Sequence, residues 1–90
     1  MPGNKKGTLY IPQTIRLPGP FIVKVKQLKP MQMKEKHGEF YDAIWDDKAM
    51  TIDINRKIPH KRKWYVFAHE YAHVINDWIH WLINEEIARG

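Results

Sequence analysis

The chain has 90 residues, a length that fits one small domain, and it contains no cysteine, which excludes disulfides and thiolate zinc sites. No apolar run approaches the roughly 20 residues that a membrane-spanning helix needs, so we expect a soluble cytoplasmic protein. The net charge of +5 fits a solvated surface or an anionic partner such as nucleic acid, although no phosphate-binding glycine loop accompanies it.

The first twenty residues are expected to form a flexible arm that precedes a single domain at residues 21–90. Proline and glycine interrupt this segment too often for a helix, at Pro2, Gly3, Gly7, Pro12, Pro18, Gly19 and Pro20. Its polar, basic beginning also lacks the apolar stretch of a signal peptide.

Residues 21–28 have the alternation of a half-buried strand, with Val23 and Val25 on one face and lysines on the other. Residues 29–38 are polar and end in glycine, which indicates a loop or a short helix. A hairpin is then expected from residues 39–45 and 49–54, with a turn over residues 46–48. In its second arm the inward residues would be Met50, Ile52 and Ile54, and the outward ones Thr51 and Asp53.

From His60 to about Trp78 the apolar residues recur at helical spacing and form one broad face: Trp64, Phe67, Ala68, Tyr71, Ala72, Ile75 and Trp78. Asn84 is a good N-cap, and Glu85 and Glu86 suit the positive end of a helix dipole, so a separate short helix is expected from residue 84. The predicted fold class is α+β, with a small antiparallel sheet of about three strands packed on the long helix, followed by the short C-terminal helix.

The long helix carries the motif His69-Glu70-Tyr71-Ala72-His73. Two histidines four residues apart lie about 40° apart around a helix and one turn apart along it, so both imidazoles can bind one Zn²⁺ ion. Glu70 lies beside the ion rather than on it, where its carboxylate can take a proton from zinc-bound water. This spacing predicts His69 and His73 as metal ligands and Glu70 as the catalytic base of a metallopeptidase.

A catalytic zinc site usually has a third protein ligand. A third histidine six residues after His73 is excluded, because Ile79 stands there. Glu85, with Glu86 as the alternative, is the expected third ligand, and it requires the chain to turn back between Asp77 and Asn84. Asp77 and His80 remain candidates if neither glutamate binds the ion.

Other residues are assigned weaker roles. His80 could assist at the oxyanion and Tyr65 could line the cleft, whereas Tyr71 is expected in the core. The remaining histidines and the aspartates of the hairpin are expected to be solvated or to lie on strand exteriors, without a second metal site: His37, His60, Asp42, Asp46, Asp47 and Asp53.

The order of these motifs resembles the small gluzincin-like zinc peptidases of the ImmA/IrrE type, especially their short phage-borne members. The resemblance covers about residues 21–89 and rests on GEFYDAIWDDKAMTIDI, KRKWYVFAHEYAHVI and NEEIA in this order. It implies a compact α+β fold, ligands at His69, His73 and a downstream glutamate, Glu70 as base, and a protein substrate that could be a repressor.

The sequence alone leaves two other functions open. The basic residues could make a non-enzymatic, DNA-associated or regulatory protein with a structural or vestigial zinc site. The domain could also be an interaction module with an inactive peptidase fold. The oligomeric state does not follow from the sequence.

Overall fold

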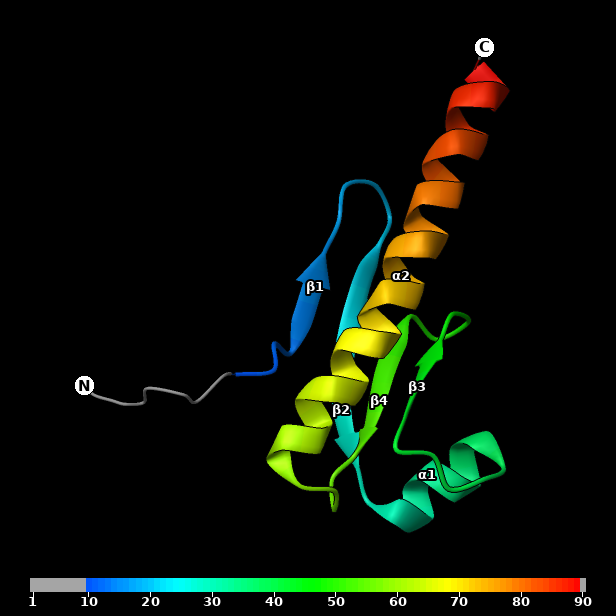
Figure 1. Cartoon of the computed structure of the whole chain (residues 1–90). Coiled ribbons are helices and arrows are strands. Elements are labelled where there is room, and N and C mark those ends of the chain that lie inside the picture. Colours follow the sequence, from blue (N-terminus) through cyan, green and yellow to red (C-terminus); the bar gives the residue numbers. More distant parts are fainter. Residues whose placement is uncertain (1–9, 90) are drawn as a thin grey trace, which may run out of the picture.

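The computed structural model describes residues 10–89, which form four strands and two helices (Figure 1). In chain order these are β1 (Thr14–Arg16), β2 (Ile22–Leu28), α1 (Pro30–His37), β3 (Ala43–Asp46), β4 (Thr51–Asn55) and α2 (His60–Arg89). The predicted α+β class is confirmed. Among the described residues, no helix combines the length and hydropathy that crossing a bilayer requires.

The sheet is mixed and has four strands in the order β1-β2-β4-β3, which corrects the prediction of about three antiparallel strands. Strands β1 and β2 pair antiparallel, as do β3 and β4, but β2 and β4 run parallel. The parallel pair arises because the chain leaves β2 through α1 and β3 before it returns as β4. Strand β3 stands last in the strand order, so it is an edge strand, and its outer edge faces away from β4.

Strand β1 lies within the segment expected to be a flexible arm, so residues 14–16 belong to the folded domain. Ile15 is buried in the core, and the turn after β1 contacts α2. Residues 1–9 of the predicted arm lie outside the described residues.

The predicted strand at 21–28 and the hairpin are confirmed in outline, with shorter hairpin arms. In the turn, Asp46 Oδ1 accepts hydrogen bonds from the main-chain N–H groups of Lys48 and Ala49, both at 3.1 Å. Met50 closes this turn with a φ of 59° rather than joining the strand. All three residues predicted to point inward contact the main core: Ile52 and Ile54 are buried in it, and Met50 packs against it.

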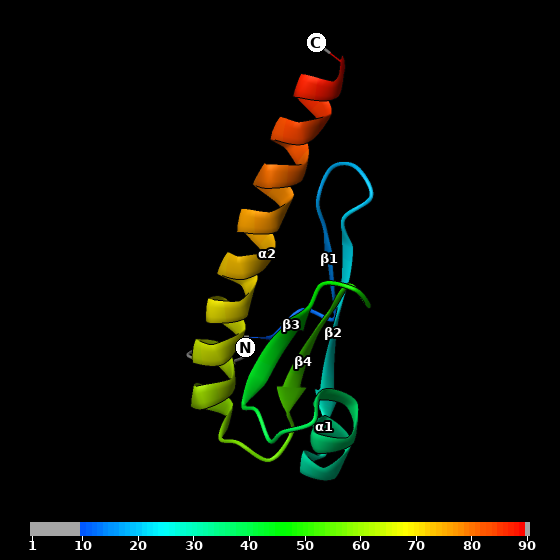
Figure 2. The same ribbon diagram turned by 90° about the vertical axis from the view of Figure 1, so that its right-hand side faces the viewer.

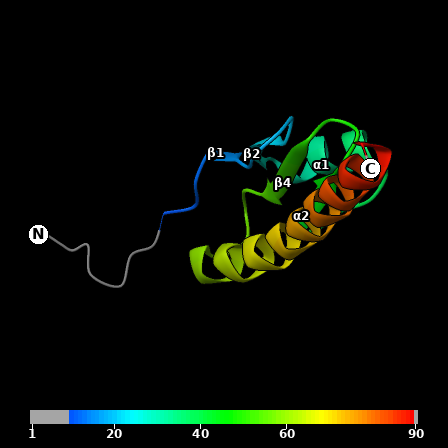
Figure 3. The ribbon, with the colours of Figure 1, turned by 90° about the horizontal axis from the view of Figure 1, so that it is seen from above.

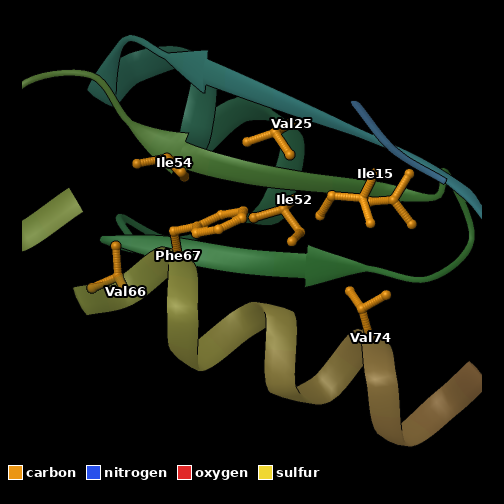
Figure 4. Packing of buried hydrophobic residues seen from close by; sticks show 8 residues of the cluster. Ile15, Val25, Ile52, Ile54, Val66, Phe67 and Val74 are labelled. Atoms are coloured by element: carbon orange, nitrogen blue, oxygen red, sulfur yellow. The ribbon is translucent and has the colours of Figure 1, made fainter. Parts of the chain in front are cut away.

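Helix α2 lies across one face of the sheet, and α1 lies on the other side (Figures 2 and 3). Figure 4 shows the core between α2 and the sheet, where Phe67 and Val74 of α2 meet Val25 and Ile52 of the strands. On the opposite face, Met33 of α1 is fully buried. Both faces of β4 are thus covered, which is why Thr51 and Asp53, predicted to point outward, are buried as well.

Helix α2 is continuous from His60 to Arg89, which corrects the predicted turn between Asp77 and Asn84 and the separate short helix. The segment contains no glycine or proline, and two of its tryptophans hold it against the β1–β2 turn. Trp78 Nε1 donates to the main-chain oxygen of Pro18 at 2.9 Å, and the rings of Trp81 and Phe21 lie 6.0 Å apart. Beyond Trp81 the helix extends past the sheet (Figure 1).

Candidate metal centre

The two histidines of the motif lie together on an exposed part of α2. His69 Nε2 and His73 Nε2 are 3.3 Å apart, with the imidazole rings at 77° to each other. Two nitrogen ligands at 2.0–2.1 Å from a tetrahedral zinc ion lie roughly 3.3–3.4 Å from one another. The pair therefore already has the separation that a shared zinc ion requires.

Glu70 points from α2 toward the outer edge of β3. Its Oε1 accepts a hydrogen bond of 2.9 Å from the main-chain N–H of Trp45. Because β3 pairs with β4 on its other side, this N–H belongs to the unpaired edge of the sheet. The indole Nε1 of Trp45 donates to Asp77 Oδ2 at 2.8 Å, so α2 holds Trp45 at two points about two helical turns apart.

A hollow of about 290 Å³ lies beside His69 and Glu70, between the beginning of β3 and the first turns of α2. Tyr65 lines it, as the sequence suggested. On its rim, Arg62 forms an ion pair of 3.0 Å with Asp42 and stacks over the Tyr65 ring at 5.3 Å. The lining residues are Asp42, Ala43, Arg62, Tyr65, Val66, His69 and Glu70.

The structure does not bring Glu85 to the histidines. Because α2 is continuous, Glu85 lies about 18 Å farther along the helix axis than His73, and Glu86 lies farther still. His80 is about 10 Å from His73 along the same axis. Within residues 10–89, no third histidine or carboxylate joins His69 and His73 in a three-ligand group.

The tyrosine of the motif is placed as predicted. Tyr71 packs against the main core and stacks on Phe67, with ring centroids 5.8 Å apart and planes at 6°. It therefore takes no part in the exposed site.

A second polar cluster lies on the other side of the sheet and was not predicted. The side chain of Asp53 is fully buried, and its Oδ2 lies 2.7 Å from both Lys36 Nζ and His37 Nε2. His37 is itself mostly buried, which corrects its assignment as solvated. The sequence signal that could have revealed the cluster is the charged residue between Ile52 and Ile54, on a strand covered on both faces.

His37, Asp46 and Asp53 could together hold a metal ion, because one ligand atom of each lies within 4.8 Å of the others. However, the ammonium of Lys36 is already among these oxygens, 2.7 Å from Asp53 Oδ2 and 3.9 Å from Asp46 Oδ2. The cluster thus has an internal cation that ties α1 to β4, and we assign it this structural role.

Comparison with known proteins assigns no family to the chain: no family model, curated protein or solved structure matches it. A function for the chain therefore has to be argued from the geometry of the His69–His73 pair and its surroundings.

Proposed function

We propose that the chain is a zinc-dependent hydrolase that cleaves a peptide bond beside the outer edge of β3. The observation that carries the proposal is the 3.3 Å separation of His69 Nε2 and His73 Nε2, next to a Glu70 carboxylate that accepts a hydrogen bond from edge strand β3. His69 and His73 would supply two of the three protein ligands of a usual catalytic zinc site. The remaining positions are open to water, to substrate or to a ligand from another chain.

His69 and His73 would hold the ion through their Nε2 atoms. When bound there, zinc supplies Lewis-acid chemistry: it lowers the pKa of water and polarises a substrate carbonyl.

Glu70 would act as the general base. Its Oε1 accepts the Trp45 N–H, which fixes the carboxylate at the edge of the hollow and leaves Oε2 for proton transfer. A carboxylate held in this way can accept a proton from a water molecule on the histidine side and deliver it to the leaving nitrogen.

The substrate would bind as an added strand. In the antiparallel β3–β4 pair, hydrogen-bonded and non-hydrogen-bonded residues alternate, and the bond from Asn55 N–H to the Asp42 oxygen makes Ala43 and Trp45 non-hydrogen-bonded positions. The Trp45 N–H is bonded to Glu70, so Ala43, which lines the hollow, and the Trp45 carbonyl offer the outward main-chain groups. An extended peptide can hydrogen-bond to such an edge, as in other cases of strand addition. This arrangement favours an unfolded segment or a loop of a protein as substrate; a repressor is one such protein.

A second candidate function is binding of a polyanion without catalysis. A separate hollow of about 530 Å³ lies at β1 and β2 and is lined in part by Lys24, Lys26 and Arg56. Clustered cations of this kind favour phosphate contacts, which weaken steeply with salt. DNA binding that depends on salt and survives chelation of metal would favour this function over the first.

The test of the first proposal is peptide cleavage by the zinc-loaded protein on a library of unstructured peptides, with His69→Ala and His73→Ala as controls. We expect cleavage by the parent and none by either variant. Cleavage that persists in both variants would exclude this site as the catalytic centre.

A further inference from the structure

Helix α2 carries a second regular stripe that the sheet does not cover. We define the back stripe as eight residues whose spacing alternates strictly between four and three: Lys61, Tyr65, Ala68, Ala72, Ile75, Ile79, Leu82 and Glu86. This alternation is the heptad repeat of helices that pack along their whole length. The stripe spans nearly the entire 30-residue helix.

The back stripe points away from the core. Ile79 lies about 140° around the helix from Val74, which is fully buried against the sheet. Tyr65 is 67% exposed, Ile79 44% and Leu82 38%, and the neighbouring Ile83 is 50% exposed. Large apolar side chains that repeat in register on an open helix face mark an interaction surface.

We propose that this surface pairs with the same surface of a second copy of the chain, with the two α2 helices antiparallel. In the register that overlaps the two stripes fully, the residue numbers of two facing residues add up to 147, so the first stripe residue of one helix faces the last of the other. Ala68 then faces the partner's Ile79, and Ala72 faces the partner's Ile75. Each small residue therefore meets a branched one, and the same contacts repeat across the two-fold axis.

The charged residues at the two ends of the back stripe favour antiparallel over parallel pairing. The ends of the stripe carry Lys61 and Glu86, and the antiparallel register places Lys61 against the partner's Glu86 at both ends. A parallel pair would instead place Lys61 against Lys61 and Glu86 against Glu86, and like charges at such positions oppose pairing.

The partner fits sterically because the sheet lies on the other side of α2, so the dimer would be layered as sheet, helix, helix and sheet (Figure 3). Tyr65 belongs both to the back stripe and to the hollow beside His69. The dimer would therefore place the partner's Leu82 at the border of the candidate site. Pairing itself needs neither zinc nor catalysis.

The first test is sedimentation equilibrium of the full chain, with Ile79→Glu as the disrupting variant and Asn84→Glu as the control of equal added charge outside the stripe. We expect the parent and Asn84→Glu to form dimers. The dimer dissociation constant of Ile79→Glu should be at least about tenfold higher than that of the parent. Circular dichroism should show that Ile79→Glu keeps its fold. A parent that stays monomeric, or a dimer that Ile79→Glu leaves intact, would overturn the proposal.

Cross-linking tests the register. Since the chain has no cysteine, Ala68→Cys and Ile79→Cys each introduce a single thiol. Position 68 would lie about 16 Å along the axis from position 68 of the partner, so neither variant should form a disulfide alone, whereas their mixture should. A disulfide in Ala68→Cys alone would contradict the antiparallel pairing. Lys61→Glu should weaken the dimer, and adding Glu86→Lys should restore it.

Discussion

The main-chain N–H of Trp45 donates to Oε1 of Glu70 at 2.9 Å, which ties the proposed general base to the open edge of the sheet. Glu70 is half-buried on the side of α2 that faces β3, whereas the two histidines of the motif are exposed. It also relates the base to the place where an extended peptide could add to β3. Substitutions at Glu70 and at the histidines should therefore separate the loss of the base from the loss of the metal.

We expect the purified protein to bind one zinc ion per chain and to melt at a higher temperature with zinc than with chelator. Metal that binds only the native state adds its binding free energy to the free energy of unfolding. Elemental analysis and thermal melts measure both effects. His69→Ala should abolish binding, whereas His80→Ala should not. If the purified protein contains no zinc and melts at the same temperature with zinc and with chelator, the proposed metal site is wrong.

Glu70→Gln should keep zinc but lose about a hundredfold or more in kcat, because the amide cannot accept a proton. Gln can still accept the hydrogen bond from Trp45 through its side-chain oxygen, so the fold and zinc content should be unchanged. The measurement is kcat on any peptide that the parent cleaves, beside zinc content. Full activity would show that Glu70 is not the base, and loss of zinc would show that it is a ligand.

Glu85→Ala and Glu86→Ala should each change the zinc affinity of the isolated chain by less than about twofold. Both residues follow His73 on a continuous helix, and Glu85 is about 18 Å away along the axis. Calorimetric titration with zinc provides the comparison. A large loss for Glu85→Ala alone would restore the sequence-based assignment of Glu85 as third ligand and require α2 to bend.

Lys36→Met should destabilise the fold by roughly 2 kcal/mol or more, because it removes a cation from a fully buried carboxylate. The matched variant is Lys36→Met with Asp53→Leu, which removes the buried carboxylate together with the Lys36 ammonium and should recover part of the loss. Urea unfolding of both variants measures the difference. Equal stability of Lys36→Met and the parent would mean that His37 alone satisfies Asp53.

Two glycines with similar backbone angles form a matched pair for a packing test. Gly19 has a φ of 89°, and a Cβ added there would lie 2.6 Å from Cζ3 of Trp81; Gly38 has a φ of 83° with nothing within 4 Å. Alanine at both sites adds backbone strain of about 1 kcal/mol, but only Gly19→Ala must also displace Trp81. We therefore expect Gly19→Ala to lower the free energy of unfolding more than Gly38→Ala. Equal losses would show that Trp81 moves aside freely.

The sequence by itself determined the elements whose signals are local. The alternation at residues 21–28 predicted β2, and the spacing from Trp64 to Trp78 predicted most of α2. The four-residue separation of His69 and His73 predicted a nitrogen pair on one helix face, because helix geometry alone fixes it.

Tertiary structure decided the features that depend on contacts between distant residues. Asn84, Glu85 and Glu86 have the composition of a helix start, yet α2 continues through them. The contacts of Trp78 and Trp81 with the β1–β2 turn keep the preceding segment helical, and no glycine or proline interrupts the helix after it. Asp53 has the alternation of an exterior residue, yet α1 buries it together with Lys36 and His37. The contact of Glu70 with Trp45 likewise depends on β3 being the edge strand beside α2. No local pattern encodes this, because sheet order is set by which strands pair across the whole chain.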